Sequence, residues 1–334
     1  MWKFSFVFLF SITALFSCHQ ADKKVSDYTE NRTPIQALTD SISNDSLNVH
    51  LLNRRALMYI GQRQLNEALL DINRALKINS KEPDLFLSLA EIYFQLGKKE
   101  NCTAALLKVI EINPQETEAY NKLSQLNLLN QRFDFALSYS DKSLAIDRYN
   151  AKTLYIRGMI FLARQDTASA MRNFLLAYDV KHDFYDALIQ IGAIYNKQNN
   201  PIAADYLKEA VNRFPELAQA RYEYALYLQE NGNPNAAMAN YDTLLMQFPA
   251  NKFVYFNIGY LYLIFDQQFD SALFYFDRSL TIDPKYIDAL YNKGRTLEEM
   301  GKLNAAKEIY QDVLRYSANY ELAIEALNRI ERKK

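Results

Sequence analysis

The residues best suited to chemistry in this 334-residue chain are three histidines and two cysteines. His19, His50 and His182 have no spacing that would ligate zinc or form a catalytic triad. Cys18 and Cys102 are too few for a disulfide framework or a cysteine-rich zinc site. The chain also lacks a glycine-rich phosphate loop, a nucleophile elbow and an HExxH motif. The sequence therefore predicts a protein that is not an enzyme, with no catalytic residue, metal or cofactor.

The charges are spread along the chain without a concentrated patch. Lysine and arginine number 38 and aspartate and glutamate 39, which gives a formal net charge of −1. Nucleic-acid binding normally needs a concentrated basic face, so we expect no nucleic-acid partner. The adjacent carboxylates of Glu298 and Glu299 would diverge by about 100° on a helix, which favours a solvated surface over an acid-base pair.

Cys18 ends a segment typical of an export signal. Lys3 is followed by an apolar run from Phe4 to Phe16, and then by Ser17 and Cys18. The run has 13 positions, whereas a helix that spans a bilayer takes about 20 apolar residues. We therefore expect a processed leader and not a transmembrane helix.

Leu15 to Cys18 resembles the lipobox of bacterial lipoproteins, in which the leader is cut before an acylated cysteine. Phe16 departs from the small residue usual at its position. The resemblance implies a signal peptide over 1–17, lipidation of Cys18, and a lipidated N-terminus with a flexible tether over 18–33. Contact with the membrane would then be through the N-terminal lipid only. His19 in place of Asp after the cysteine implies the outer membrane, with the body facing the periplasm or the exterior.

Small residues recur with a period of 33 to 35 residues, which predicts a repeat architecture. They are Ala56, Ala90, Ser124, Gly158, Gly192, Ala225, Gly259 and Gly294. A second small series follows the first by 11 to 13 residues, at Ala68, Cys102, Ala136, Ala170, Ala203, Ala237, Ala272 and Ala306. A bulky residue stands four after each member of the second series, except at Ser140. We expect two helices per repeat, crossing where the small residues let the backbones approach.

This pattern resembles the tetratricopeptide repeat family, whose 34-residue units have small residues at positions 8 and 20, an aromatic residue at 11 and proline at 32. The resemblance implies an all-α fold, a right-handed superhelical solenoid of about eight helix-turn-helix units with N- and C-terminal capping helices. The units are expected at 49–82, 83–116, 117–150, 151–184, 185–217, 218–251, 252–286 and 287–320. Units that depart from 34 residues are expected to take the change in the turn between their helices.

The capping helices are expected at 34–48 and 321–334, on either side of the repeats at 49–320. Thr33 is expected to cap the first of them, with Pro34 at its first helical position, where the missing amide hydrogen costs nothing. An open stack of repeats needs such helices to cover its end faces.

In this family, positions 2, 5, 9 and 12 of each unit line the concave side. Toward the C-terminal half, the implied groove contains Tyr155, Met159, Tyr222, Leu226, Phe253, Phe256, Tyr260, Leu263 and Tyr291. Toward the N-terminus the same positions hold Asn53, Asp84, Glu91, Asn121 and Gln125. Exposed aromatic side chains suit an extended or helical peptide. Alternatively, the closing helix or the superhelix curvature covers several of them.

Two functions are consistent with these features. The first is an envelope adaptor, a lipid-anchored scaffold whose groove binds a peptide or protein of a cell-envelope assembly. The second is a glycan- or solute-binding envelope lipoprotein whose aromatic groove stacks on sugar rings, with Glu223 and Asn257 the nearest groups to read hydroxyls. The long array favours the first.

Overall fold

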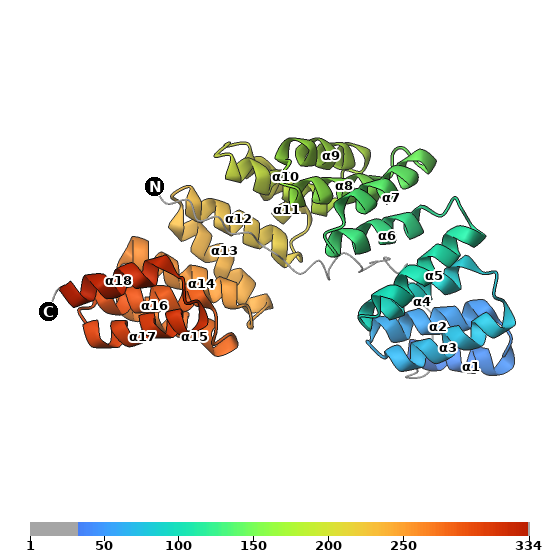
Figure 1. Cartoon of the computed structure of the whole chain (residues 1–334), viewed down its shortest axis with the longest axis horizontal. Coiled ribbons are helices and arrows are strands. Elements are labelled where there is room, and N and C mark those ends of the chain that lie inside the picture. The colour runs from blue at the N-terminus through green and yellow to red at the C-terminus, as the bar shows by residue number, and fades with distance from the viewer. Residues whose placement is uncertain (1–32, 333–334) are drawn as a thin grey trace. The chain divides into compact units, whose positions relative to one another are not determined.

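The computed structural model describes residues 33–332, which form helices joined by short turns and contain no strand (Figure 1). The helices are α1 (Pro34–Asn44), α2 (Val49–Gly61), α3 (Leu65–Ile78), α4 (Pro83–Gln95), α5 (Lys99–Ile112), α6 (Thr117–Leu129), α7 (Phe133–Ile146), α8 (Ala151–Ala163), α9 (Thr167–Val180), α10 (Tyr185–Lys197), α11 (Ala203–Arg213), α12 (Ala218–Glu230), α13 (Pro234–Gln247), α14 (Lys252–Leu261), the π-helical turn η2 (Tyr262–Asp266), α15 (Phe269–Ile282), α16 (Ile287–Glu299), α17 (Leu303–Tyr316) and α18 (Glu321–Arg332). Among these described helices, none has the length and apolar character to cross a membrane.

The described chain divides into two compact bodies between Lys181 and His182. The N-terminal body contains α1 to α9, and the C-terminal body contains α10 to α18. In each body, consecutive helices pack as four hairpins, from α2 with α3 to α16 with α17. We call the opening helix of each hairpin the first helix and the other the second helix. The expected all-helical arrangement of paired helices is confirmed.

A bulky side chain of the second helix lies over the small residue of the first helix. A Cβ atom added at Gly158 would lie 2.5 Å from Cε1 of Phe174, and one added at Gly259 would lie 2.9 Å from Cδ1 of Phe276. Both rings are fully buried. The two helices can therefore approach this closely only because the first one has no side chain at the crossing.

The hairpin of α6 and α7 lacks this ring and uses a hydrogen bond in its place. Ser140 occupies the position of the bulky residue, and both Ser124 and Ser140 are fully buried. The Ser124 hydroxyl donates to the backbone oxygen of Ala136 at 2.7 Å. The exception at Ser140 is therefore compensated by a polar contact, which satisfies the buried hydroxyl of Ser124.

Each hairpin turn in residues 33–332 contains one residue with a left-handed backbone, at φ of 53 to 76°. These residues are Arg63, Gly97, Gln131, Gln165, Asn199, Gly232, Gln267 and Gly301. Glycine adopts this conformation freely, whereas another residue is disfavoured there by roughly 1 kcal/mol. A left-handed residue is thus common to all eight hairpin turns although the residue types differ.

The hairpin of α14 and α15 accommodates its extra residue inside a helix. The sequence spacing places this residue in the turn, but the structure contains a π-helical turn, η2, at the end of α14. The backbone N–H of Gln268 donates to the oxygen of Tyr262 at 3.0 Å, and Gln267 is the left-handed residue. The wider turn absorbs one residue, so the connection to α15 keeps its usual conformation.

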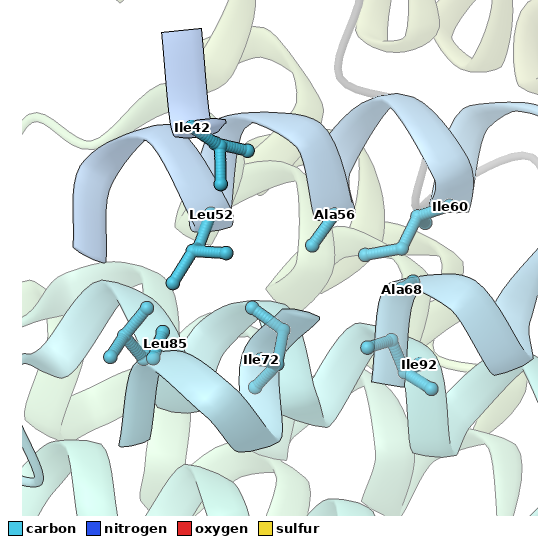
Figure 2. Close-up of a cluster of buried hydrophobic side chains, with 9 residues drawn as sticks. Ile42, Leu52, Ala56, Ile60, Ala68, Ile72, Leu85 and Ile92 are labelled. Atoms are coloured by element: carbon cyan, nitrogen blue, oxygen red, sulfur yellow. The ribbon is translucent and has the colours of Figure 1, made fainter. Parts of the chain in front are cut away.

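Single helices cover the two ends of the hairpin series. Thr33 and Gln36 form the reciprocal hydrogen bonds of a capping box at the start of α1, which confirms the expected cap. Ile42 of α1 lies in a buried cluster with side chains of α2, α3 and α4, among them Leu52 and Ile72 (Figure 2). At the other end, α18 buries Ile330 in a cluster with residues of α16 and α17.

Candidate functional site

An aromatic surface lies on the first helices of the C-terminal body and is centred on α14. Val254 and Ile258, four residues apart, are fully buried on one side of this helix. Phe253, Phe256 and Tyr260 occupy another side and are only partly buried. The sequence of α14 therefore places one stripe of side chains in the core and leaves a second, aromatic stripe partly exposed.

The rings on and around α14 contact one another. The centroid of Tyr286, which immediately precedes α16, lies 5.6 Å from that of Phe253 and 5.3 Å from that of Phe256, and both pairs are edge-to-face. Phe256 and Tyr260 are 6.4 Å apart. Such pairs contribute about 0.5–1.5 kcal/mol each beyond burial. We define the aromatic face as Phe253, Phe256, Tyr260, Tyr286 and Tyr291, and the predicted groove residue Tyr222, which is only 6% exposed, supports this face from α12.

Polar contacts hold the edges of the aromatic face. On the α12 side, Asn257 of α14 donates from Nδ2 to the hydroxyl of Tyr222 at 3.1 Å. On the α16 side, the ring of Tyr291 lies 5.5 Å from that of Tyr320, which precedes α18. Burial raises the pKa of the Tyr222 and Tyr286 phenols further above their ordinary value of 10, so both are neutral at physiological pH.

Two other predicted groove residues of the C-terminal body contribute to packing. Leu226 is partly buried against the cluster that contains Tyr241. Leu263, in the π-helical turn, is 4% exposed and packs with Ala272 and Phe276.

The two remaining predicted residues lie in the N-terminal body. Tyr155 of α8 is 5% exposed, and its ring centroid is 5.5 Å from that of Phe174. Met159, one turn further on, is partly buried beside Ile156 and Leu128. The structure thus divides the nine predicted residues, with two in one body and seven in the other.

Three carboxyl groups stand among the first helices of the C-terminal body. Loss of water on burial raises the pKa of Glu223 to about 7 and that of Asp186 to about 6. Burial also raises the pKa of Asp288, and the Tyr320 hydroxyl is 3.5 Å from its Oδ1. The sequence identifies Glu223 only as a group that could form hydrogen bonds with the hydroxyls of a sugar ligand. The register did not identify Tyr286, because this residue lies in the connection before α16. The sequence signal for it is an aromatic residue two positions after Pro284.

The first helices of the N-terminal body are joined by ion pairs. Lys122 of α6 contacts Glu91 of α4 at 2.9 Å, with side chains only 11% and 12% exposed. Lys152 of α8 contacts Glu118 of α6 at 2.8 Å. Each lysine therefore neutralises a carboxylate of the preceding first helix.

Neutral hydrogen bonds cross the same face of the N-terminal body. The Ser88 hydroxyl donates to Asn53 Oδ1 at 2.7 Å, and the Thr153 hydroxyl donates to Asn121 Oδ1 at 2.7 Å. Asn121 and Thr153 are buried. These contacts and the ion pairs satisfy polar side chains within the body itself.

The chemistry-bearing residues form no reactive arrangement in the described chain. Residues 33–332 contain no cluster of three metal-ligating side chains. Cys102 is buried, and burial raises the pKa of its thiol to about 11, which disfavours the reactive thiolate. Glu298 accepts two hydrogen bonds from Arg329, whereas Glu299 is exposed, so these adjacent carboxylates point in different directions.

Three segments match tetratricopeptide repeat families, at 83–116, 195–252 and 263–330. An uncharacterized protein, ycf37 of Guillardia theta, is 36% identical over 75 residues, which are 22% of this chain and 42% of that protein. Tetratricopeptide repeat protein 13 of Homo sapiens is 26% identical over 130 residues, which are 38% of this chain and 15% of that protein. The chain spans less than half the length of either relative.

Solved structures share the fold at low sequence identity. The APC/C hetero-tetramer Cut9–Hcn1 gives a TM-score of 0.64 at 15% identity, over 89% of this chain and 58% of that chain. PilW, a type IV pilus biogenesis factor, gives 0.58 at 17% identity, over 63% and 98%. A tetratricopeptide repeat protein of Parabacteroides merdae gives 0.57 at 15% identity, over 75% and 98%. The three matches identify tetratricopeptide repeats within this chain, and the solved structures show that its paired helices have the fold of a tetratricopeptide repeat solenoid.

Proposed function

We propose that this protein is a non-enzymatic scaffold that binds a peptide or protein of a cell-envelope assembly through its aromatic face. The observation that carries the proposal is the set of partly buried rings on α14 and around Tyr286. Rings already ordered by their neighbours lose little rotamer entropy on binding and contribute a large contact area. A stack of helix pairs presents such a surface without catalytic groups.

Anchoring to the envelope is the second part of the proposal. It is supported by the leader pattern that ends at Cys18, which lies outside the described residues. Acylation would attach the protein to the outer membrane through lipid alone, since each buried methylene contributes about 0.8 kcal/mol.

Crosslinking in intact cells, followed by identification of captured proteins, tests the binding surface. The double variant Phe256→Ala/Tyr260→Ala is expected to lose captured partners. Phe274→Ala is the matched control, because Phe274 is an aromatic residue of the second helix α15 that is 52% exposed and lies outside the aromatic face. Circular dichroism of each variant checks that the fold is retained.

The proposal is wrong if the double variant captures the same proteins as the wild type. Retention of the purified protein on a glycan column, lost in the same variant, would favour a sugar ligand for the same rings instead.

Metabolic labelling with palmitate tests the anchor. The wild-type chain is expected to carry label and to sediment with membranes, and Cys18→Ala is expected to lose both properties. Equal membrane association of the two forms would exclude lipidation as the means of attachment.

A further inference from the structure

The aromatic face is flanked by two carboxylates without a cationic partner. Glu223 lies on α12 and Asp288 at the start of α16, and both are partly buried. Among residues 33–332, neither makes an ion pair. Lys197 of α10 acts on Glu223 from beyond ion-pair distance, and Asp288 has only the Tyr320 hydroxyl at 3.5 Å.

Both carboxylates interact electrostatically with tyrosine side chains at or beside the aromatic face. Glu223 contributes to raising the pKa of the Tyr222 phenol, and Tyr222 and Asp288 each contribute to raising that of Tyr286. In both phenols the larger cause is burial. The geometry agrees, because α12, which carries Glu223, is joined to α14 by the hydrogen bond from Asn257 to Tyr222, and Asp288 lies 3.5 Å from the Tyr320 hydroxyl, whose ring contacts Tyr291.

The N-terminal body shows what is missing at these positions. Glu223 has the same place in its repeat as Lys122, whose partner is Glu91 at 2.9 Å in the preceding first helix. The residue that corresponds to Glu91 in α10 is Ala193, so the pair is replaced by a single carboxylate.

The same comparison applies to Asp288. It corresponds to Glu118, which is neutralised at 2.8 Å by Lys152 of the next first helix. The residue that corresponds to Lys152 after Asp288 is Leu322 of α18, which has no charge. Partly desolvated carboxylates of this kind are stabilised when a cation approaches them.

The rings themselves accommodate an ammonium group within the chain. Nζ of Lys252 lies 5.0 Å from the centroid of Phe253 and 5.0 Å from that of Tyr286. The same Nζ pairs with Asp283. Rings and a carboxylate together thus stabilise a cation at one edge of the aromatic face.

We propose that the aromatic face binds a partner segment in which lysine or arginine side chains alternate with apolar ones. The apolar side chains contact Phe256, Tyr260 and Tyr291, and the cations approach Glu223 and Asp288. The charge of the partner is therefore complementary to the two carboxylates. This inference rests on the proposed function and specifies the chemistry of its ligand.

Three matched peptides test the inference by fluorescence anisotropy with the full-length chain in nonionic detergent. They share one apolar pattern, and their polar positions are all lysine, all glutamine or all glutamate. We expect the lysine peptide to bind about tenfold more tightly than the glutamine peptide, and the glutamate peptide to bind most weakly. In Glu223→Gln/Asp288→Asn, which keeps the side-chain shapes, the lysine preference should fall below about threefold. Glu299→Gln and Asp270→Asn, at exposed positions outside the face, should keep the preference.

The outcomes separate the two proposals. Equal binding of the lysine and glutamine peptides, lost in Phe256→Ala/Tyr260→Ala, would overturn the charge preference and leave the aromatic face as a binding surface. A lysine preference that survives Glu223→Gln/Asp288→Asn would also overturn the assignment of these carboxylates. Binding of all peptides that is unchanged in Phe256→Ala/Tyr260→Ala would remove both proposals.

Discussion

The first helices of the two bodies present different surfaces on the same scaffold. In the N-terminal body, Glu91 and Lys122 pair across neighbouring first helices, and buried Asn121 accepts a hydrogen bond from Thr153. In the C-terminal body, rings occupy the equivalent region, and carboxylates such as Glu223 have no cationic partner among the described residues. The N-terminal body pairs charged side chains of neighbouring first helices with one another, whereas the C-terminal body retains carboxylates whose interactions a ligand can complete.

The repeat therefore specifies the core but not the first-helix surface. Gly158 with Phe174 and Gly294 with Tyr310 make the same close approach in different bodies. The surface residues vary between repeats because they do not determine how the helices cross. A recognition surface can therefore change along the chain without a change of fold.

The largest effect is expected from breaking an ion pair in the N-terminal body. Glu91→Gln leaves Lys122, which is mostly buried, without its nearest carboxylate. We expect the free energy of unfolding to fall by about 2 kcal/mol, less than for a fully buried pair because Glu118 lies 3.8 Å from Lys122. Urea unfolding followed by circular dichroism measures the loss.

Glu111→Gln is the control for this variant, because Glu111 forms an exposed pair with Lys108 and should contribute less than about 0.5 kcal/mol. Equal losses in the two variants would show that the mostly buried pair stabilises the protein no more than the exposed pair does.

The shared core predicts similar losses in both bodies. Gly158→Ala and Gly294→Ala place a methyl group 2.5 and 2.8 Å from the rings of Phe174 and Tyr310. Each is expected to lower the unfolding free energy by about 1–2 kcal/mol, since overpacking exceeds the gain in helix propensity. Thermal melting measures it. Gly61→Ala, with no atom within 4 Å, should be neutral or stabilising, and a loss there as large as at Gly158 would contradict the packing explanation.

Removing the charge of Glu223 should have the opposite sign to removing that of Glu91. The pKa of Glu223 rises from its ordinary 4.5 to about 7 on folding, so the folded state retains a proton that the unfolded state releases. Wild-type stability from this group is thus present below pH 4.5 and is lost as pH rises through about 7. We expect Glu223→Gln to be more stable than the wild type by about 1 kcal/mol at pH 8 and not at pH 4.

Urea unfolding at the two pH values checks this difference. The groups that interact electrostatically with Glu223 are Lys197 of α10, Tyr222 and Glu230 of α12, and Tyr241 of α13. A variant less stable than the wild type at pH 8 would show that one of them, or another group, stabilises the charged carboxylate.

The smallest effect is expected at the turns, where the bodies should respond alike. Gln131→Gly and Gln267→Gly place glycine at left-handed positions, at φ of 57 and 53°. Each should raise the unfolding free energy by about 0.5–1 kcal/mol, because the strain at a Cβ is removed. Gly232→Gln should lower the unfolding free energy by a similar amount. Thermal melting of the three variants compares them, and a gain in only one body would indicate different turn geometry.

The crossing of the two helices in each hairpin could be predicted from the sequence because its contacts lie within one repeat. The small residue at Gly158 and the ring of Phe174 are fixed by helical periodicity and a short turn. The ion pair of Lys122 with Glu91 could not be read in this way, because it joins different repeats through flexible side chains. Tyr286 was missed because it lies in a connection, where the first-helix register does not apply. The place of Phe256 and Tyr260 on a binding groove stays a prediction.

The π-helical turn at Tyr262–Asp266 has a consequence for how such arrays change in length. An inserted amino acid can be taken up by a helix end, so the reversal that follows keeps its geometry and the next helix docks as before. Length variation between repeats is then confined to the end of one helix, here to Tyr262–Asp266. Insertions at helix ends are thus a route by which the exposed pattern of one repeat can alter while its neighbours stay in place.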